Sequence, residues 1–367
     1  MYQPRKPSQG QPIMPKTPET PQTPKTQKTP AAPGQPTHPQ NACLVTGCAG
    51  FVGSHLTDAL LSLGFPVVGV DIIPRAQAAN LSDAFGNPAF RYVEHDITRH
   101  GVLKRCHEEY PRIGHVFHLA AVVMVAFSME HPELTMATNY TATQALHAES
   151  REAGAQAFVF AGSAAEYGDD PRLPLREEYA DPQTVHNSPY GRSKYLSSRL
   201  MQESGYGCSL RFFNIFGPRQ DPSSPYSGVV SKFITQATAG DELAIFGDGG
   251  QTRDFIYVSD VVRSYLIAGG VIPNPATGLT APLSGIYNVG TGSSITIRSL
   301  AEKAIATTGT GSSIRHAAPR AGDIYHSQAD ISLFTQTTAF APQITFEEGL
   351  RRTIAWANSQ HAAAGKA

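Results

Sequence analysis

The chain has 367 residues, a formal net charge of −1 and 41% hydrophobic residues, the composition of an ordinary globular protein. It carries no long basic run, so nucleic acid and anionic membrane surfaces are poor candidates for partners. The sequence shows no apolar run of about 18 residues, no hydrophobic leader and no CxxC pair among its cysteines, so we expect a cytoplasmic protein with reduced thiols.

The two ends of the chain differ in composition from the part between them. Residues 1–40 are rich in Pro, Thr, Gln and Lys, with runs such as TPETPQTPKT, and contain almost nothing that could form a core. This composition predicts a disordered tail. We also expect residues 359–367 to be flexible, which leaves 41–358 as the folded part.

Strand-like and helix-like segments alternate from residue 42 onward. Buried strands are predicted at residues 43–47, 66–72, 90–97, 114–121 and 157–163, with an amphipathic helix after the first and further helices near 98–110 and 133–153. This order predicts right-handed βαβ units, and therefore a doubly wound parallel sheet of the Rossmann type. Beyond residue 211, short strands at 243–247 and 253–258 and helices near 227–239, 259–269, 297–307 and 346–358 predict a smaller, interleaved α/β domain.

The segment GCAGFVG at residues 47–53 lies between the first strand and the amphipathic helix. Its glycines would allow a tight turn and a close approach of the backbone to a pyrophosphate, whose charge the helix N-terminus would receive. The sequence therefore predicts a dinucleotide site that includes Gly47, Gly50, Phe51, Val52 and Gly53.

Asp71 ends the next strand at the distance from this loop where an acidic residue would bind a ribose 2′-hydroxyl. Because its carboxylate would repel a 2′-phosphate, we expect NAD and not NADP. Arg75, close by, is the one feature that favours NADP.

The segment SPYGRSK at residues 188–194 places a phenol and an ammonium on one helix face. Residues four apart are neighbours on a helix, so Lys194 is expected to lie close to Tyr190 and to lower its pKa from about 10. The same spacing also occurs at Tyr2 and Lys6 in the tail, so spacing alone proves little.

The GxxGxxG spacing, HDI at residues 95–97, HLAA at 118–121 and the YxxxK helix together resemble the extended short-chain dehydrogenase/reductase superfamily, over about residues 42–358. The resemblance implies that Asp96 and Ile97 flank the adenine, that Ala120 and Ala121 pass along NAD, and that Asn139 supports the active-site strand. It also implies that Ser163, Tyr190 and Lys194 are catalytic, with Lys194 also binding the nicotinamide ribose. A homodimer built from the YxxxK helix and the helix before it is expected on resemblance alone.

Three further motifs are similar to those of nucleotide-sugar epimerases, in particular UDP-hexose 4-epimerases. They are RFFNIFGPRQDPSSPYSGVVSKF (211–233), IFGDGGQTRDFIYVSD (245–260) and PRAGDIYHSQAD (319–330). The similarity implies substrate roles beside Ser163: the diphosphate for Asn214, Arg253 and Arg320, the uridine ribose for Asp323, and the uracil surroundings for Val230 and Phe246. Arg219 is expected mainly to hold its loop.

By the same resemblance, residues 41–213 with about 251–290 form the NAD domain, and 214–250 with 291–358 form the domain for a UDP-sugar. The implied reaction is epimerisation at C4 through a transient 4-keto sugar, with Tyr190 moving the proton and NAD moving the hydride. A small Ser327 beside the sugar C2 substituent would leave room for an N-acetyl group. No metal-ligand spacing occurs in the sequence, and the chemistry needs no metal.

Other activities of the superfamily stay open. In 4,6-dehydratases an Asp-Glu pair follows the catalytic Thr, whereas Ala164 and Ala165 stand there; decarboxylases of UDP-glucuronate carry a Glu where Ala165 stands. Glu166 is one residue later and would point elsewhere if the segment is extended. UDP-glucuronate epimerases and a 4-ketoreductase are further alternatives, and a non-enzymatic nucleotide-binding protein is disfavoured by the intact triad. The apolar run at residues 122–125 and Gly162, where a second Ser is common, depart from the family pattern and could alter the sugar pocket.

Overall fold

The computed structural model describes residues 41–221, 228–319 and 324–364. All of them belong to one compact unit that spans His38–Ala367. The predicted tail, residues 1–40, lies outside the described residues. Of the predicted flexible C-terminus, residues 359–364 continue the last helix, α12 (Phe346–Ala364), beyond its predicted end at residue 358.

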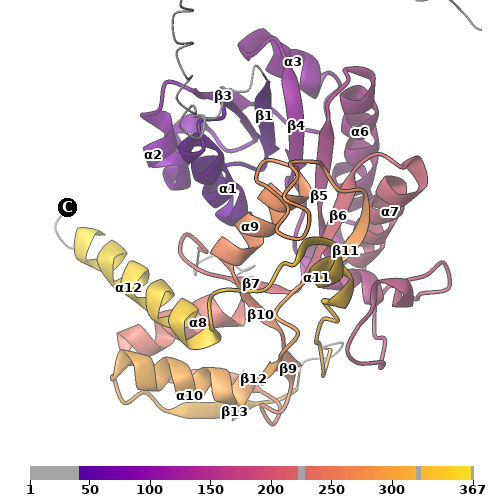
Figure 1. Ribbon diagram of the computed structural model, residues 1–367. Coiled ribbons are helices and arrows are strands. Elements are labelled where there is room, and N and C mark those ends of the chain that lie inside the picture. The colour runs from indigo at the N-terminus through magenta and orange to yellow at the C-terminus, as the bar shows by residue number, and fades with distance from the viewer. Residues whose placement is uncertain (1–40, 222–227, 320–323, 365–367) are drawn as a thin grey trace, which may run out of the picture. The chain divides into compact units, whose positions relative to one another are not determined.

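A seven-stranded parallel sheet forms the centre of this unit, which confirms the predicted doubly wound fold (Figure 1). Four of its strands are buried along their whole length, as expected when helices cover both faces of a parallel sheet, whereas the two edge strands are partly exposed. In spatial order they are β11 (Gly285–Val289), β6 (Cys208–Phe212), β5 (Ala157–Ser163), β4 (Ile113–His118), β1 (Ala42–Thr46), β2 (Val67–Asp71) and β3 (Phe90–Glu94).

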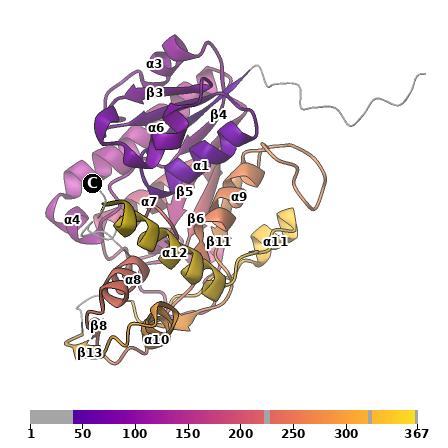
Figure 2. The same ribbon diagram turned by 90° about the vertical axis from the view of Figure 1, so that its left-hand side faces the viewer.

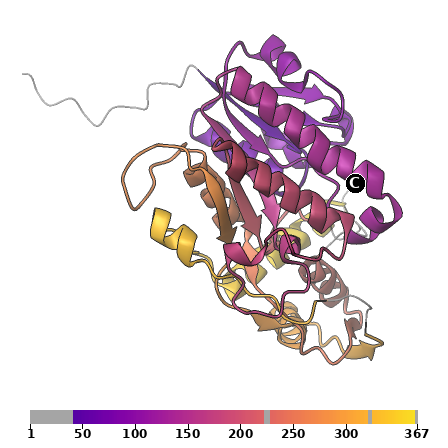
Figure 3. The ribbon, with the colours of Figure 1, turned by 90° about the vertical axis from the view of Figure 1, so that its right-hand side faces the viewer.

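Helices pack on both faces of the sheet. On one face lie α1 (Phe51–Ser62) and α9 (Val258–Ala268) (Figure 2). They bury apolar side chains such as Leu56 and Val261 in a shared core cluster. On the other face lie α3 (Val102–Glu109), α6 (Ala142–Glu152) and α7 (Pro189–Ser204) (Figure 3). Their side chains, such as Leu146 and Met201, belong to a second cluster. Shorter elements join them: α2 (Ser82–Phe85), α4 (Val125–Glu130), α5 (Pro132–Met136) and a π-helical turn (Ala137–Thr141).

The residues beyond β6 form smaller sheets and a third apolar cluster. β8 (Leu243–Phe246) pairs with β13 (Ile314–Ala317), β9 (Thr252–Arg253) with β12 (Ile295–Thr296), and β7 (Asn214–Phe216) with β10 (Phe255–Tyr257). Helices α8 (Val229–Ala239), α10 (Ile297–Thr308) and α12 bury residues such as Phe233, Leu300 and Leu350 against them. A last short helix, α11 (Ser332–Thr338), packs Phe334 into the first cluster.

Candidate active site

The glycine-rich loop between β1 and α1 packs closely against the segment that follows β4. Gly47 has φ +70°, and a Cβ there would lie 2.8 Å from the backbone nitrogen of Ala120. Gly50 is the N-cap of α1, and no side chain caps this helix. The first-turn amides of α1, which no side chain caps, therefore fit a dinucleotide pyrophosphate. Phe51, Val52 and Gly53, also predicted for this site, form the first turn of α1.

Asp71 lies at the end of β2, beside the loop. Its carboxylate accepts hydrogen bonds from the backbone nitrogens of Ala49 (2.9 Å) and Ile73 (3.2 Å). Burial raises the pKa of Asp71, and these hydrogen bonds oppose that effect. Arg75 stacks its guanidinium over the ring of Phe85, 3.9 Å from the ring centre.

The other residues predicted for the cofactor lie after the carboxyl ends of β3 and β4. Asp96 accepts hydrogen bonds from the backbone and hydroxyl of Thr98, and Ile97 is buried. Ala120 and Ala121 follow β4. Asn139 exchanges two hydrogen bonds with the backbone of Val122, one residue further on, and its amide also donates to Ser193 on α7. It thus ties the segment after β4 to the helix that carries Tyr190.

Ser163, the last residue of β5, is the N-cap of a 3₁₀ turn (Ala164–Tyr167). Its Oγ accepts a hydrogen bond from the backbone nitrogen of Ala165 at 3.2 Å. Since a hydroxyl has a single hydrogen, the proton of Ser163 remains for donation to another oxygen.

The start of α7 brings Tyr190 against this turn. Ser188 caps the helix by accepting from the backbone of Gly191 (3.1 Å), and Pro189 fits its first turn. A Cβ on Gly191 would lie 2.5 Å from the carbonyl oxygen of Ala165, so only glycine permits this approach. The Ser163 side chain lies within reach of the Tyr190 phenol and lowers its pKa by hydrogen bonding.

Lys194 is 3% exposed and donates from Nζ to the carbonyl oxygen of Ala161 (2.8 Å). Its Nζ lies 5.9 Å from the centre of the Tyr190 ring. Burial lowers the pKa of Lys194 to about 8, an effect that the Glu166 carboxylate opposes.

The expected lowering of the Tyr190 pKa by Lys194 is wrong for the chain by itself. Burial raises the pKa of Tyr190, the hydrogen bond with Ser163 lowers it, and the Glu166 carboxylate raises it further. The reason is that the loss of hydration destabilises the phenolate more than the hydrogen bond with Ser163 stabilises it.

The segment after Ser163 is not extended, contrary to the premise on which the position of Glu166 was predicted. In the 3₁₀ turn, Glu166 points into the protein, is 0% exposed and pairs with Arg211 at 2.5 Å. Arg211 was not recognised from the sequence as part of this region. The sequence feature that could have revealed it is a charged residue inside the largely apolar run CSLRFF. A charge is rarely buried without a partner, so such a residue indicates a buried counter-charge.

Three of the residues predicted to bind substrate lie around one pair of short strands. The backbone amide of Asn214 in β7 donates to the carbonyl oxygen of Asp254. β7 pairs with β10, which begins two residues after Arg253. Ser327, 7% exposed, donates its backbone amide to the carbonyl of Thr252 at 3.1 Å. These bonds place Asn214, Arg253 and Ser327 in one neighbourhood.

The remaining predicted substrate residues differ in burial. Phe246 ends β8 and is half-buried, whereas Val230 in α8 is 2% exposed and packs in the third apolar cluster. Arg320 and Asp323 lie outside the described residues. Arg219 binds Asp58 of α1 at 2.7 Å, which fits the expectation that it holds its loop.

The apolar run at residues 122–125 leads into α4 beside Tyr190. Val123 and Val125 are 56% and 50% exposed, and Ser128 in α4 accepts a hydrogen bond from the backbone of Tyr190 at 3.3 Å. The departure from the family pattern therefore puts apolar surface next to the start of α7.

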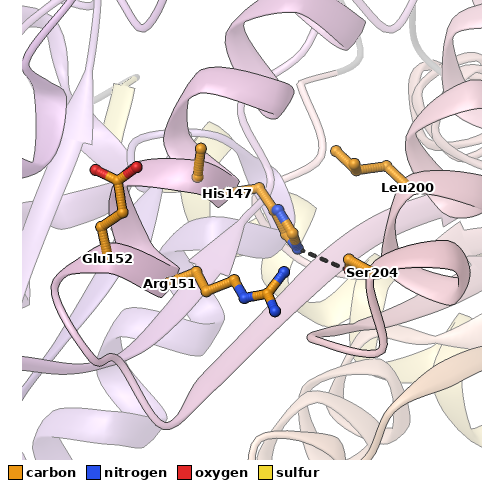
Figure 4. Close-up of a pocket in the computed structure, with 6 residues that line it drawn as sticks. His147, Arg151, Glu152, Leu200 and Ser204 are labelled. Atoms are coloured by element: carbon orange, nitrogen blue, oxygen red, sulfur yellow. Dashed lines mark hydrogen bonds between the residues drawn. The ribbon is translucent and has the colours of Figure 1, made fainter.

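A cavity of about 550 Å³ lies away from these residues, between α6 and α7 (Figure 4). The ring of His147 and the hydroxyl of Ser204 are hydrogen-bonded within it, and Arg151, Glu152 and Leu200 also line it. No predicted site residue lines this cavity.

Taken together, a Rossmann sheet, a glycine-rich loop and a Ser-Tyr-Lys set define the class of NAD-dependent short-chain dehydrogenase/reductase-type enzymes. The family model described as "NAD dependent epimerase/dehydratase family" matches residues 43–290, and the chain belongs to this family. The predicted cofactor, NAD, and the predicted superfamily are thereby confirmed.

Individual relatives have different activities. A UDP-glucose 4-epimerase from Mycolicibacterium smegmatis is 34% identical over 85% of this chain and 96% of its own. A UDP-N-acetyl-alpha-D-glucosaminuronate decarboxylase from Bacillus cytotoxicus is 30% identical over 86% and 98%. The crystal structure of the UDP-glucose 4-epimerase from Thermotoga maritima with UDP-glucose has a TM-score of 0.77 and 31% identity, and covers 87% of this chain and 99% of that chain. The chain is thus an enzyme of a family in which epimerases and decarboxylases share one fold.

Among the described residues, no helix is long and apolar enough to cross a membrane. Within the same ranges, no group of His, Cys, Asp and Glu side chains is arranged to hold a metal ion.

Proposed function

We propose that this enzyme interconverts UDP-hexoses that differ in configuration at C4, such as UDP-glucose and UDP-galactose. The observation that carries the proposal is the set of side chains around Ser163. Tyr190 reaches this serine, Lys194 lies behind it, and the two positions that follow it, Ala164 and Ala165, carry only methyl groups. Such a site can move one proton at one sugar hydroxyl.

The mechanism follows from the hydrogen bonds of the chain. Ser163, whose Oγ already accepts from Ala165, would donate its proton to the substrate oxygen and orient it toward Tyr190. Tyr190 would take the proton of the 4-hydroxyl and later return it to the 4-keto oxygen. Lys194 would hold positive charge beneath this pair. The loop at Gly47 and Asp71 would hold NAD, and the chemistry that NAD would supply there is reversible hydride transfer at C4.

The position of Glu166 supports epimerisation over elimination or decarboxylation. A dehydratase needs a further acid and base, and the only carboxylate in the turn after Ser163 is buried and paired with Arg211. A carboxylate bound in this way is poorly placed to move protons at C5 or C6 of a sugar. A 4-ketoreductase would need only the same triad, so net consumption of NADH is the result that would favour it.

The diphosphate would be neutralised by Arg253, with Asn214 beside it, and by Arg320. The uridine would involve Asp323, Phe246 and Val230. Two guanidiniums suit a diphosphate because each can form paired, charge-assisted hydrogen bonds. Support comes from the shared neighbourhood of Asn214, Arg253 and Ser327. In this proposal residues 41–213 with 251–290 bind NAD, and 214–250 with 291–358 bind the UDP-sugar.

The enzyme would also accept UDP-N-acetylhexosamines. Ser327 is a small side chain fixed by its backbone to Thr252, next to Arg253, and would leave room beside the C2 substituent. We further propose a homodimer that packs α6 and α7 of two copies together, as the superfamily resemblance implies.

Separate incubations with UDP-Glc, UDP-Gal, UDP-GlcNAc and UDP-GlcA test the proposed reaction. The products are resolved by chromatography and mass. Epimers keep the substrate mass, dehydration loses water and decarboxylation loses carbon dioxide. Products of lower mass, or no product from UDP-Glc and UDP-Gal, would refute the proposal.

A further inference from the structure

Glu166 and Arg211 form an ion pair that is completely removed from solvent, directly behind Ser163. Glu166 Oε2 and Arg211 Nε are 2.5 Å apart, and both side chains are 0% exposed. A buried ion pair adds little stability compared with apolar residues of the same volume, because both charges lose their hydration. Its position therefore calls for an explanation other than stability.

The second oxygen of this carboxylate joins the strand of Ser163 to the helix of Tyr190. Glu166 Oε1 accepts from the backbone nitrogen of Ser163 (2.9 Å) and from the hydroxyl of Ser198 (2.8 Å). Ser198 lies four residues after Lys194 and eight after Tyr190 in α7, so all three share one helix face. One oxygen thus connects the strand end that carries Ser163 to the helix that carries Tyr190 and Lys194.

Arg211 anchors the carboxylate from the other side. It pairs with Gly162 in the β5–β6 register, and its Nη1 donates to the hydroxyl of Tyr167 (3.2 Å) and to the carbonyl of Glu177 (2.8 Å). Tyr167 in turn donates to Asn288 in β11 at 2.6 Å. The carboxylate is therefore held by the sheet itself, across β6 and β11.

Gly162 is the residue that makes room for this carboxylate. A Cβ at this position would lie 2.9 Å from Glu166 Oε1 and 2.6 Å from the hydroxyl of Ser209. Ser209 is itself hydrogen-bonded to Ser198 at 2.7 Å. The Glu166 carboxylate therefore fills the space beside Gly162, and a side chain at position 162 would displace it.

We propose that Glu166, held by Arg211 and accommodated by Gly162, is a positioning residue that sets Ser163 against Tyr190 for proton transfer. It acts through the Ser163 backbone and Ser198, and touches neither substrate nor NAD. The proposal rests on the proposed C4 chemistry only in that this chemistry uses Ser163 and Tyr190.

The test compares two variants that each remove one buried charge. Glu166→Gln keeps an oxygen for the Ser163 amide but cannot neutralise Arg211. The control is Asp260→Asn, because Asp260 is also buried and paired with an arginine, Arg263, but its carboxylate binds the backbone of Gln343 and Ile344 and neither Ser163 nor α7. Turnover is measured on whichever UDP-sugar the wild type converts, NAD binding by calorimetry, and the Ser163–Tyr190 hydrogen bond by crystallography.

We expect Glu166→Gln to lower kcat by about 10- to 100-fold with KM changed less than about threefold, because reacting groups are misplaced while binding is kept. NAD affinity should stay at the wild-type level, and the Ser163–Tyr190 hydrogen bond should be lost in the crystal. Asp260→Asn should lower the melting temperature and leave kcat unchanged. Gly162→Ala, which displaces the carboxylate without removing it, should lower kcat in the same way. If Glu166→Gln does not fold, this variant tests the positioning role of Glu166 in its place.

Three results would overturn the positioning role of Glu166. They are an unchanged kcat in Glu166→Gln, an equal loss of kcat in Asp260→Asn, and a Ser163–Tyr190 hydrogen bond that is intact in Glu166→Gln. A wild type that does not epimerise at C4 refutes the proposed function instead, and the crystallographic comparison still decides the role of Glu166.

Discussion

The ammonium of Lys194 donates a hydrogen bond to the backbone carbonyl of Ala161, with 2.8 Å between Nζ and the oxygen. This bond fixes the positive charge beneath β5, two residues before Ser163, and not on the phenol of Tyr190. Lys194 therefore acts on the site from the side of β5, and the activity of the enzyme should depend on whether Lys194 is protonated.

Activity should fall as the pH rises through about 8. Burial lowers the pKa of Lys194 to about 8 from an ordinary value of about 10.4, so the ammonium is present below pH 8 and lost above it. The measurement is kcat/KM against pH with saturating NAD. Lys194→Arg, which stays charged, should show low activity without this alkaline limb. A wild-type profile that stays flat to about pH 10 contradicts the assignment.

Tyr190→Phe should lower kcat by about 100- to 10,000-fold, because the group that moves the proton is removed. Binding of NAD and UDP, measured by calorimetry, should stay nearly unchanged. Tyr195→Phe is the matched control, since Tyr195 lies on the same helix, is 7% exposed and stacks against His186. Equal losses in the two variants would show that the phenol of Tyr190 has no special part.

The enzyme should bind NAD more tightly than NADP. The Asp71 carboxylate is fixed by two backbone amides, and Arg75 is stacked on Phe85. Asp71→Asn should narrow the preference by about tenfold or more, because the repulsion of a 2′-phosphate is removed. Titrations of the wild type and of Asp71→Asn with NAD and with NADP measure the ratio of the two affinities. Equal affinity of the wild type for NAD and NADP sinks the prediction.

Ser327→Tyr should lower kcat/KM for UDP-GlcNAc far more than for UDP-Glc, because bulk beside C2 excludes the N-acetyl group first. Ser327→Ala serves as the control and should preserve both activities. If the wild type converts UDP-galactose but not UDP-GlcNAc, the proposed pocket is wrong.

Asp254→Ala should destabilise the fold by about 2–4 kcal/mol. The Asp254 carboxylate is 0% exposed and accepts hydrogen bonds from the backbone of Thr291, Gly292 and Ala329 and from the Thr291 hydroxyl. The free energy of unfolding in urea measures the loss. Asp241→Ala, at an exposed carboxylate, should change it by less than about 0.5 kcal/mol.

The parts of the fold that were predictable are those with a strong local pattern. Apolar runs gave β1, β2, β4 and β5, and the glycine spacing gave the start of α1. The sequence patterns did not predict β6 and β11, and the next-to-last residue of each is a buried polar one, Arg211 and Asn288. A polar residue breaks the apolar run, and only its distant partner explains why it is tolerated.

The candidate site divides in a similar way. Motif spacing predicted Ser163, Tyr190 and Lys194, which the fold brings together from a strand and a helix. It did not predict the orientation of Glu166, because that depends on a 3₁₀ turn and on Arg211, 45 residues further along the chain. It also gave the wrong direction for the Tyr190 pKa, since burial is a property of the folded state that spacing does not contain.

The most direct test of the proposed reaction follows a deuterium atom placed at C4 of UDP-galactose. With catalytic NAD, we expect UDP-glucose of unchanged mass that still carries the deuterium at C4, because the hydride returns to the carbon from which it came. Loss of water or carbon dioxide, loss of the label, or a requirement for stoichiometric NADH would contradict C4 epimerisation by this enzyme.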